Sequence, residues 1–177
     1  MAILEAATRI ASVDGVESLT FGSLAEATGI SKSGLYAHFG SKERLQQETI
    51  EAAWAIFERE VMAPTEVAPP GVARLEALFE AYFSYLERGV FPGGCFFAAL
   101  LAEMDARTGP IHDSVVVLED TWRRDLWEMA GEAKRLGEIR TDVDVNYCAD
   151  EASDWRSVRW VGSEAGDRTV EVGKAEG

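Results

Sequence analysis

The segment from Ser31 to Lys42 gathers side chains that can hold a nucleic acid. It reads SKSGLYAHFGSK, with two lysines, a tyrosine and a histidine set among small hydroxyl residues. Lysine ammonium groups attract phosphate, and hydroxyl, phenol and imidazole groups donate hydrogen bonds to phosphate oxygens or to base edges. From Lys32 to Arg44 three basic residues stand against one acidic residue, a formal charge of +2 in a chain whose net charge is −14. This local basic patch indicates a confined site for a polyanion.

Helical spacing sorts this segment onto two faces. On a helix over residues 32–39, Leu35 and Phe39 lie four positions apart and are expected to point inward together with Ile30. The outward face then carries only small or polar residues and one tyrosine: Lys32, Ser33, Gly34, Tyr36 and Ala37. Such a face can enter the major groove of DNA, which is about 12 Å wide. Gly34 costs about 1 kcal/mol of helix stability relative to alanine, and close approach of the backbone to bases gives a reason for it.

The polar groups divide into two predicted roles, with a solvated surface helix as the alternative. Lys32, Ser33 and Gly34 are assigned to base edges, and Tyr36 is assigned to both bases and phosphates. His38 and Lys42 are assigned to phosphates, because Lys42 begins the following helix, where free N–H groups and the helix dipole favour an anion. With two helix caps included, the predicted DNA-binding residues are Thr20, Ser31, Lys32, Ser33, Gly34, Tyr36, His38 and Lys42.

Helices are the elements expected to position these groups. Apolar residues recur at helical spacing through most of the chain, and no convincing strand alternation precedes residue 140. Thr20 and Gly29 bound a short second helix, Ser31 and Gly40 bound the third, and Ser41 caps a long fourth helix that is expected to end at Pro64. Further helices are expected near residues 72–87, 95–104 and 111–136, with another beginning near Asp144. The segment 95–104 is apolar almost all round and is expected to be buried in the centre.

Composition limits the class of protein. The 177 residues are 47% hydrophobic and 27% charged, which suits a globular protein with a real core. No apolar run approaches the roughly 18–20 residues of a membrane span, and no signal-peptide pattern is visible, so a cytoplasmic protein is expected. Residues 1–47 carry four basic and five acidic side chains, so nearly all of the net negative charge lies downstream. This asymmetry indicates two parts with different tasks.

Catalytic and metal-binding patterns are missing from the sequence. It has no nucleophile elbow, phosphate-binding glycine loop or zinc signature, so an enzyme, a cofactor and a metal site are not expected. Cys95 and Cys148 form no CxxC pair and are expected to be reduced thiols, with Cys95 buried and inert. His112 lies beside Asp113, but no second histidine at ligand spacing accompanies it, which favours a surface histidine.

The stretch LTFGSLAEATGISKSGLYAHFGSKERL resembles the DNA-binding domain of TetR-type bacterial transcriptional repressors. The resemblance covers about residues 3–47. It implies an all-helical homodimer, with an N-terminal three-helix domain of the helix-turn-helix type and a larger C-terminal helical domain that holds a small-molecule pocket and the dimer interface. The segment PGGCFFAALLAEMDARTGPIHD is similar to the C-terminal domain of some of these repressors.

The predicted division follows from these observations. Residues 1–47 form the DNA-binding domain, residues 48–147 form the effector-binding and dimerisation domain, and residues 148–177 form an atypical, weakly structured tail. The resemblance places the effector pocket in the second part, and four aromatic residues are candidates to line it: Trp54, Phe83, Phe97 and Trp122. Plain core packing is the alternative for each of them, because aromatic residues at helical spacing are usually core.

The predicted function is a DNA-binding transcriptional regulator, a repressor that a small apolar or amphipathic effector releases from a palindromic operator. The expected partners are double-stranded DNA, that effector and a second copy of the chain, with no membrane. The tail argues against a tight dimer. Proteins of this family end with two long apolar helices that form the dimer interface, and residues 148–177 read as though truncation or a frameshift had replaced those helices. The alternative function is therefore a soluble helical ligand-binding protein with impaired dimerisation and no effective repressor activity.

Overall fold

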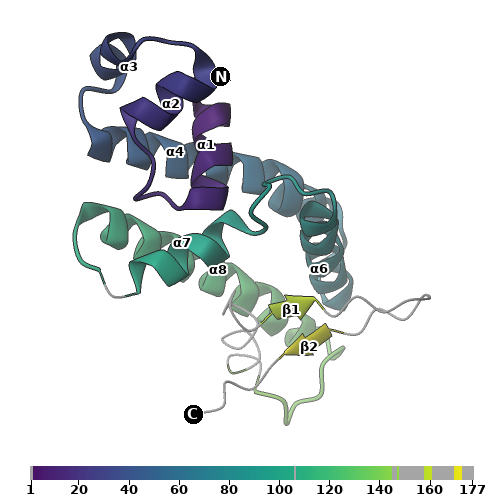
Figure 1. Ribbon diagram of the computed structural model, residues 1–177. Helices are drawn as coiled ribbons and strands as arrows, with labels where there is room; N and C mark the ends of the chain where they lie inside the picture. The colour runs from purple at the N-terminus through teal and green to yellow at the C-terminus, as the bar shows by residue number, and fades with distance from the viewer. Residues whose placement is uncertain (1, 106, 145–146, 148–157, 161–169, 173–177) are drawn as a thin grey trace.

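The computed structural model describes residues 2–105, 107–144 and 147, together with the backbone of residues 158–160 and 170–172 (Figure 1). The fold is all-α, as predicted, with a three-helix N-terminal unit that leads into a larger helical part. No helix among the described residues is long and apolar enough to cross a membrane.

Of the four N-terminal helices, the second and the third begin and end at the residues that the sequence marks. They are α1 (Ala2–Asp14), α2 (Phe21–Thr28), α3 (Lys32–Phe39) and α4 (Lys42–Phe57). Thr20 Oγ1 accepts the Ser23 N–H at 3.1 Å, and Ser23 Oγ accepts the Thr20 N–H at 3.1 Å. These two hydrogen bonds form a capping box at the start of α2. Gly29 ends α2 in the left-handed conformation with φ 71°. The predicted second and third helices are thereby confirmed.

A small core holds these helices together. Its buried residues come from α1, the α1–α2 turn, α2, α3 and the first turn of α4: Ala7, Leu19, Leu24, Leu35, Phe39 and Leu45. We call this unit the head. A second and larger core joins the rest of α4 to the remaining helices, and we call that part the body. In Figure 1 the head stands above α7 and α8, while α6 lies to one side of the body.

The helical path of α4 continues past Pro64, so the predicted end there is wrong. A π-helical turn, η1 (Glu58–Met62), leads into α5 (Ala63–Val67), and the break lies at residues 68–71. Proline lacks an N–H, but it is tolerated within the first turn of a helix, where Pro64 lies in α5. The Thr65 hydroxyl donates to the Val61 carbonyl at 2.7 Å and supplies a hydrogen bond to this irregular turn.

The body is completed by α6 (Val72–Glu87), α7 (Phe96–Met104) and α8 (Pro110–Arg135). On α7 the buried residues are Phe96, Phe97, Leu100 and Met104, whereas Ala99 and Ala102 are exposed. The expectation that this helix is buried on all sides is therefore wrong. Alanine loses little free energy when it stays in water, so a run of apolar letters does not by itself define burial.

Two short strands lie in the predicted tail, for which weak structure was expected. β1 (Val158–Trp160) pairs antiparallel with β2 (Val170–Val172), so that Val158 stands opposite Val172 and Trp160 stands opposite Val170. The remaining residues of the tail, for which weak structure was predicted, lie outside the described residues. The helix predicted from about Asp144 likewise falls largely outside them.

Candidate nucleic-acid interface

Helix α3 turns one face inward and the other to solvent. Leu35 and Phe39 are buried in the core of the head, at 0% and 1% exposure. The residues between and before them are exposed: Ser31, Lys32, Ser33, Gly34, Tyr36, Ala37 and His38. The arrangement that helical spacing predicts is present on α3. Ile30 differs, because it lies in the turn before the helix and keeps 37% of its surface exposed rather than pointing fully inward.

The Lys32 side chain of α3 reaches the start of α2 on this exposed surface. A Cβ placed on Gly22 in α2 would lie 3.4 Å from both Lys32 Nζ and Thr20 Oγ1. The structure therefore brings the Thr20 hydroxyl and the Lys32 ammonium group to the same helix start, although twelve positions separate the two residues in the sequence. A cation and a hydroxyl beside the N–H groups of a helix start form a surface to which phosphate is attracted.

Tyr36 and His38 are held by aromatic contacts while they remain exposed. The Tyr36 ring meets Phe21 of α2 edge to face, with 5.6 Å between centroids, and 59% of the residue is exposed. The His38 ring meets Phe39 edge to face at 4.6 Å. Each ring packs on an apolar neighbour while the residue stays exposed. This contact restricts the ring more than a long, flexible side chain would be restricted.

Gly34 has a structural role beside the predicted one. Ser31 Oγ accepts the Gly34 N–H at 3.1 Å and caps α3. A Cβ on Gly34 would lie 3.2 Å from the same Oγ, which is tighter than most real contacts. Ser33 joins this group, with its hydroxyl 3.2 Å from that of Ser31. A side chain at position 34 would therefore crowd the predicted Ser31 cap, a consequence for Gly34 that the sequence did not reveal.

Lys42 is engaged within the protein. Its Nζ donates to the Glu17 carbonyl at 2.7 Å and lies 3.6 Å from Glu17 Oε2. It remains 45% exposed, at the start of α4, where Ser41 Oγ accepts the Arg44 N–H. The sequence reasoning missed Glu17, which lies 25 positions away in the α1–α2 turn and belongs to no motif.

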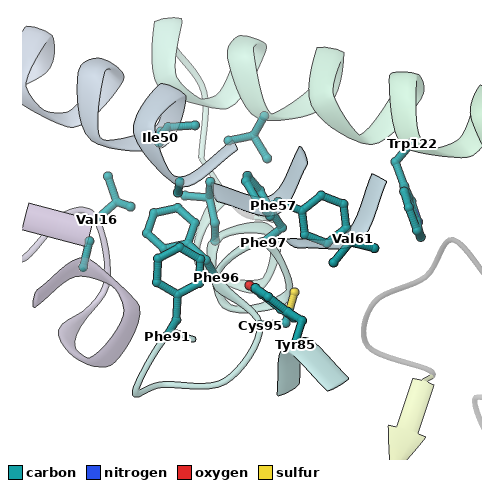
Figure 2. Close-up of a cluster of buried hydrophobic side chains, with 14 of the residues drawn as sticks. Val16, Ile50, Phe57, Val61, Tyr85, Phe91, Cys95, Phe96, Phe97 and Trp122 are labelled. Carbon is teal, nitrogen blue, oxygen red and sulfur yellow. The ribbon is translucent and has the colours of Figure 1, made fainter. Parts of the chain in front are cut away.

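Two of the four candidate effector residues, Phe97 and Trp122, lie in the aromatic core of the body (Figure 2), and the other two, Trp54 and Phe83, pack against it. Phe57 is its centre: its ring lies 5.7 Å from those of Trp54 and Phe97 and 5.6 Å from that of Trp122. Phe97 and Trp122 are buried, at 3% and 4% exposure. These two therefore act as core side chains in this conformation, and the sequence reasoning did not single out Phe57.

Trp54 and Phe83 lie at the edge of this core. Trp54 is half-buried and lines a groove of about 440 Å³ between α4 and α8, together with Ile50, Val117 and Leu118. Phe83, also half-buried, packs beside Tyr82 with 6.0 Å between ring centroids. The structure thus gathers Trp54, Phe97 and Trp122 around Phe57 and leaves Phe83 apart from them.

Cys95 and His112 have the surroundings of structural residues. Cys95 is buried with a free thiol, and burial raises the pKa of that thiol, so it stays protonated at neutral pH. His112 Nδ1 lies 3.1 Å from Asp113 Oδ1 at the start of α8. No group of three histidine, cysteine or carboxylate side chains with the spacing of a metal site occurs among the described residues.

Comparison with known families gives two matches along the chain. Residues 3–49 match the profile of bacterial regulatory proteins of the tetR family. Residues 71–153 match the profile of the tetracyclin repressor-like C-terminal domain. A comparison with curated proteins finds no match.

Solved structures with the same fold include several regulators. A TetR transcriptional regulator from Chloroflexus aurantiacus J-10-FL is 25% identical with a TM-score of 0.76, and the alignment covers 85% of this chain and 76% of that one. AibR in complex with isovaleryl coenzyme A and operator DNA is 27% identical with a TM-score of 0.69, covering 84% and 78%. PfmR, a TetR family regulator from Thermus thermophilus, is 28% identical with a TM-score of 0.64, covering 85% and 79%.

Proposed function

The chain belongs to the TetR family of bacterial transcriptional regulators, and we propose that it is a repressor that binds a near-palindromic operator as a homodimer. The observation that carries this proposal is the exposed face of α3, on which Lys32, Ser33 and Gly34 face solvent while Leu35 and Phe39 anchor the helix from beneath. Two such helices about one helical turn of DNA apart read two half-sites.

The proposed contacts divide by chemistry. Lys32, Ser33 and Gly34 meet base edges in the major groove, and Tyr36 meets both a base and a phosphate. Thr20 and Ser31 stand at the starts of α2 and α3, and His38 and Lys42 flank the start of α4, so these four residues bind phosphates and fix the register of the head on the duplex. AibR, which is 27% identical, has been solved with operator DNA, and this supports DNA as the partner.

The effector is a small apolar or amphipathic molecule that binds the body. Trp54 and the groove between α4 and α8 provide an apolar surface of suitable size, next to the aromatic core that contains Phe97 and Trp122. The isovaleryl coenzyme A bound by AibR supports an acyl compound as a class to test. Such a ligand releases DNA by binding more tightly to a conformation in which the two half-sites are wrongly spaced.

We assign the DNA-binding function to residues 1–47 and effector binding and dimerisation to residues 48–147, in the cytoplasm. The test is selection of bound sequences from random duplex DNA, with sedimentation velocity on the same sample. We expect an enriched palindrome and a dimer at low micromolar concentration. A monomer that enriches no sequence contradicts the proposal and favours the alternative, a ligand-binding protein without repressor activity.

Replacing Lys42 by alanine tests the phosphate contacts. We expect weaker binding to every duplex, with the slope of log affinity against log salt reduced by about one, because one phosphate contact releases roughly 0.9 counterion. The measurement is fluorescence anisotropy of a labelled duplex at several salt concentrations.

The matched control is Arg123→Ala, which removes a basic residue from α8 in the body and is expected to leave the slope unchanged. An unchanged slope for the Lys42 variant contradicts the assigned phosphate contact.

A further inference from the structure

The α1–α2 turn is where the body holds the head. The Glu103 carboxylate on α7 accepts two consecutive backbone N–H groups of this turn, from Val16 to Oε2 and from Glu17 to Oε1, each at 2.8 Å. Hydrogen bonds from N–H groups to an ionised carboxylate are among the stronger ones in proteins. Val16 itself is buried in the larger core, so the end of the head's first helix is anchored in the body both by packing and by Glu103.

Two glycines show how closely the parts fit at this turn. A Cβ on Gly15, whose φ is 85°, would lie 2.9 Å from Glu103 Oε1. A Cβ on Gly93, in the loop before α7, would lie 1.6 Å from the Ser12 carbonyl oxygen. Neither position has room for a side chain. The loop before α7 therefore packs directly on the last turn of α1, and the Glu103 carboxylate of α7 packs on the turn that follows.

The side chain of Glu17 stands between a cation of the head and a cation of the body. Its Oε2 lies 3.6 Å from Lys42 Nζ and 3.6 Å from Arg107 Nη1, and Arg107 belongs to the connection between α7 and α8. The Gln46 amide donates to the Val16 carbonyl at 2.9 Å, which fixes the turn against α4. One carboxylate is thus shared by the lysine assigned to phosphate and by an arginine in the connection between α7 and α8.

We propose that Glu17 is a positioning residue that limits how much of the charge of Lys42 is available to a DNA phosphate, and that Arg107 relieves this restraint by sharing the carboxylate. The inference rests on the proposed function, in which Lys42 contacts phosphate. The carboxylate competes with phosphate for the lysine, and it competes less when Arg107 also holds it. Because Glu103 and Arg107 flank the end of α7, a shift of that helix in the body changes the strength of this competition.

The test is a pair of double-mutant cycles, read by anisotropy with a random duplex at low salt. Glu17→Gln is expected to tighten binding about two- to fivefold, the range that exposed ion pairs give. Arg107→Gln is expected to weaken binding about twofold. Glu17→Gln with Arg107→Gln should bind like Glu17→Gln alone, and most of the gain from Glu17→Gln should be absent in a Lys42→Ala background.

Glu26→Gln controls for the bulk effect of charge, because it removes one carboxylate from an exposed position on α2. A gain from Glu26→Gln as large as that from Glu17→Gln overturns the specific role of Glu17. An Arg107→Gln loss that persists in the Glu17→Gln background also overturns the proposal, since Arg107 would then contact DNA itself.

Hydrogen exchange separates this inference from the proposed function. The Val16 and Glu17 amides are expected to be protected in the full chain. Both should exchange at least about tenfold faster in Glu103→Ala, and Glu103→Gln should give an intermediate rate. The control, Glu128→Ala on α8, should leave their exchange rates unchanged. Unchanged protection in Glu103→Ala contradicts the anchoring. If the wild-type chain binds no DNA at low salt, the proposed function fails and the phosphate role of Glu17 fails with it, while the exchange result still decides whether the body anchors the turn.

Discussion

Replacing Gly34 by leucine is expected to weaken operator binding by about 100-fold or more, while binding to random DNA falls by less than about threefold. Position 34 lies in the middle of the exposed face of α3, between Lys32 and Tyr36. A leucine side chain there holds the helix away from the bases, so that neighbouring base contacts are lost. Each good base contact discriminates by about 1–3 kcal/mol, and losing two of them gives a change of this size. Phosphate contacts at the ends of the helices are lengthened but not removed, so most of the affinity for random DNA is kept.

Gly34→Ala is the matched control, because it adds only the Cβ. The substitution gains up to about 1 kcal/mol of helix propensity but crowds Ser31 Oγ, so the free energy of unfolding should change by less than about 1 kcal/mol. Anisotropy with the selected operator and with a random duplex gives the two affinities, and urea unfolding shows whether each variant is folded. Equal losses on both duplexes for the leucine variant contradict base readout by α3.

The helix boundaries of the head could be predicted because their causes are local. Thr20, Ser31 and Gly29 act within three or four residues of themselves, so their letters and spacing suffice to place the ends of α2 and α3. The inward direction of Leu35 and Phe39 follows from helical spacing alone. The family resemblance added the assignment of the exposed face to DNA, which spacing by itself leaves open.

The features that the sequence did not reveal depend on contacts between distant segments. Glu17 meets Lys42 across 25 positions, and Glu103 meets the same turn across 86, so neither pairing leaves a local pattern. The path through Pro64 has a different cause, which is local: the π-helical turn before it and the Thr65 hydroxyl together accommodate a residue that usually ends a helix, and no residue pattern marked that turn. The exposed alanines on α7 show that composition predicts how hydrophobic a segment is, whereas the burial of each residue depends on which other helices pack against it.

Replacing Phe57 by alanine is expected to lower the free energy of unfolding by about 3–5 kcal/mol, the usual cost of emptying a buried aromatic site. Phe57 is fully buried, at the end of α4, and its ring centroid lies within 6.5 Å of those of five other aromatic rings: Trp54, Tyr82, Tyr85, Phe97 and Trp122. Figure 2 shows three of them, Tyr85, Phe97 and Trp122. The five rings come from α4, α6, α7 and α8, so the cavity removes contacts from every long helix of the body at once. Few substitutions in the described part of the chain remove so many edge-to-face contacts.

Trp127→Ala on α8 is the matched control, because it also removes a large ring but from a position that is 38% exposed, with Arg123 above it. Its cost is expected to stay below about 1.5 kcal/mol, and urea unfolding followed by far-ultraviolet circular dichroism measures both variants. The head has its own core, so Phe57→Ala should leave helical signal from the head at urea concentrations that unfold the body. A single transition with a loss no larger than that of Trp127→Ala contradicts the central place of Phe57. A single transition with the full loss of about 3–5 kcal/mol means instead that head and body, which share α4, unfold together.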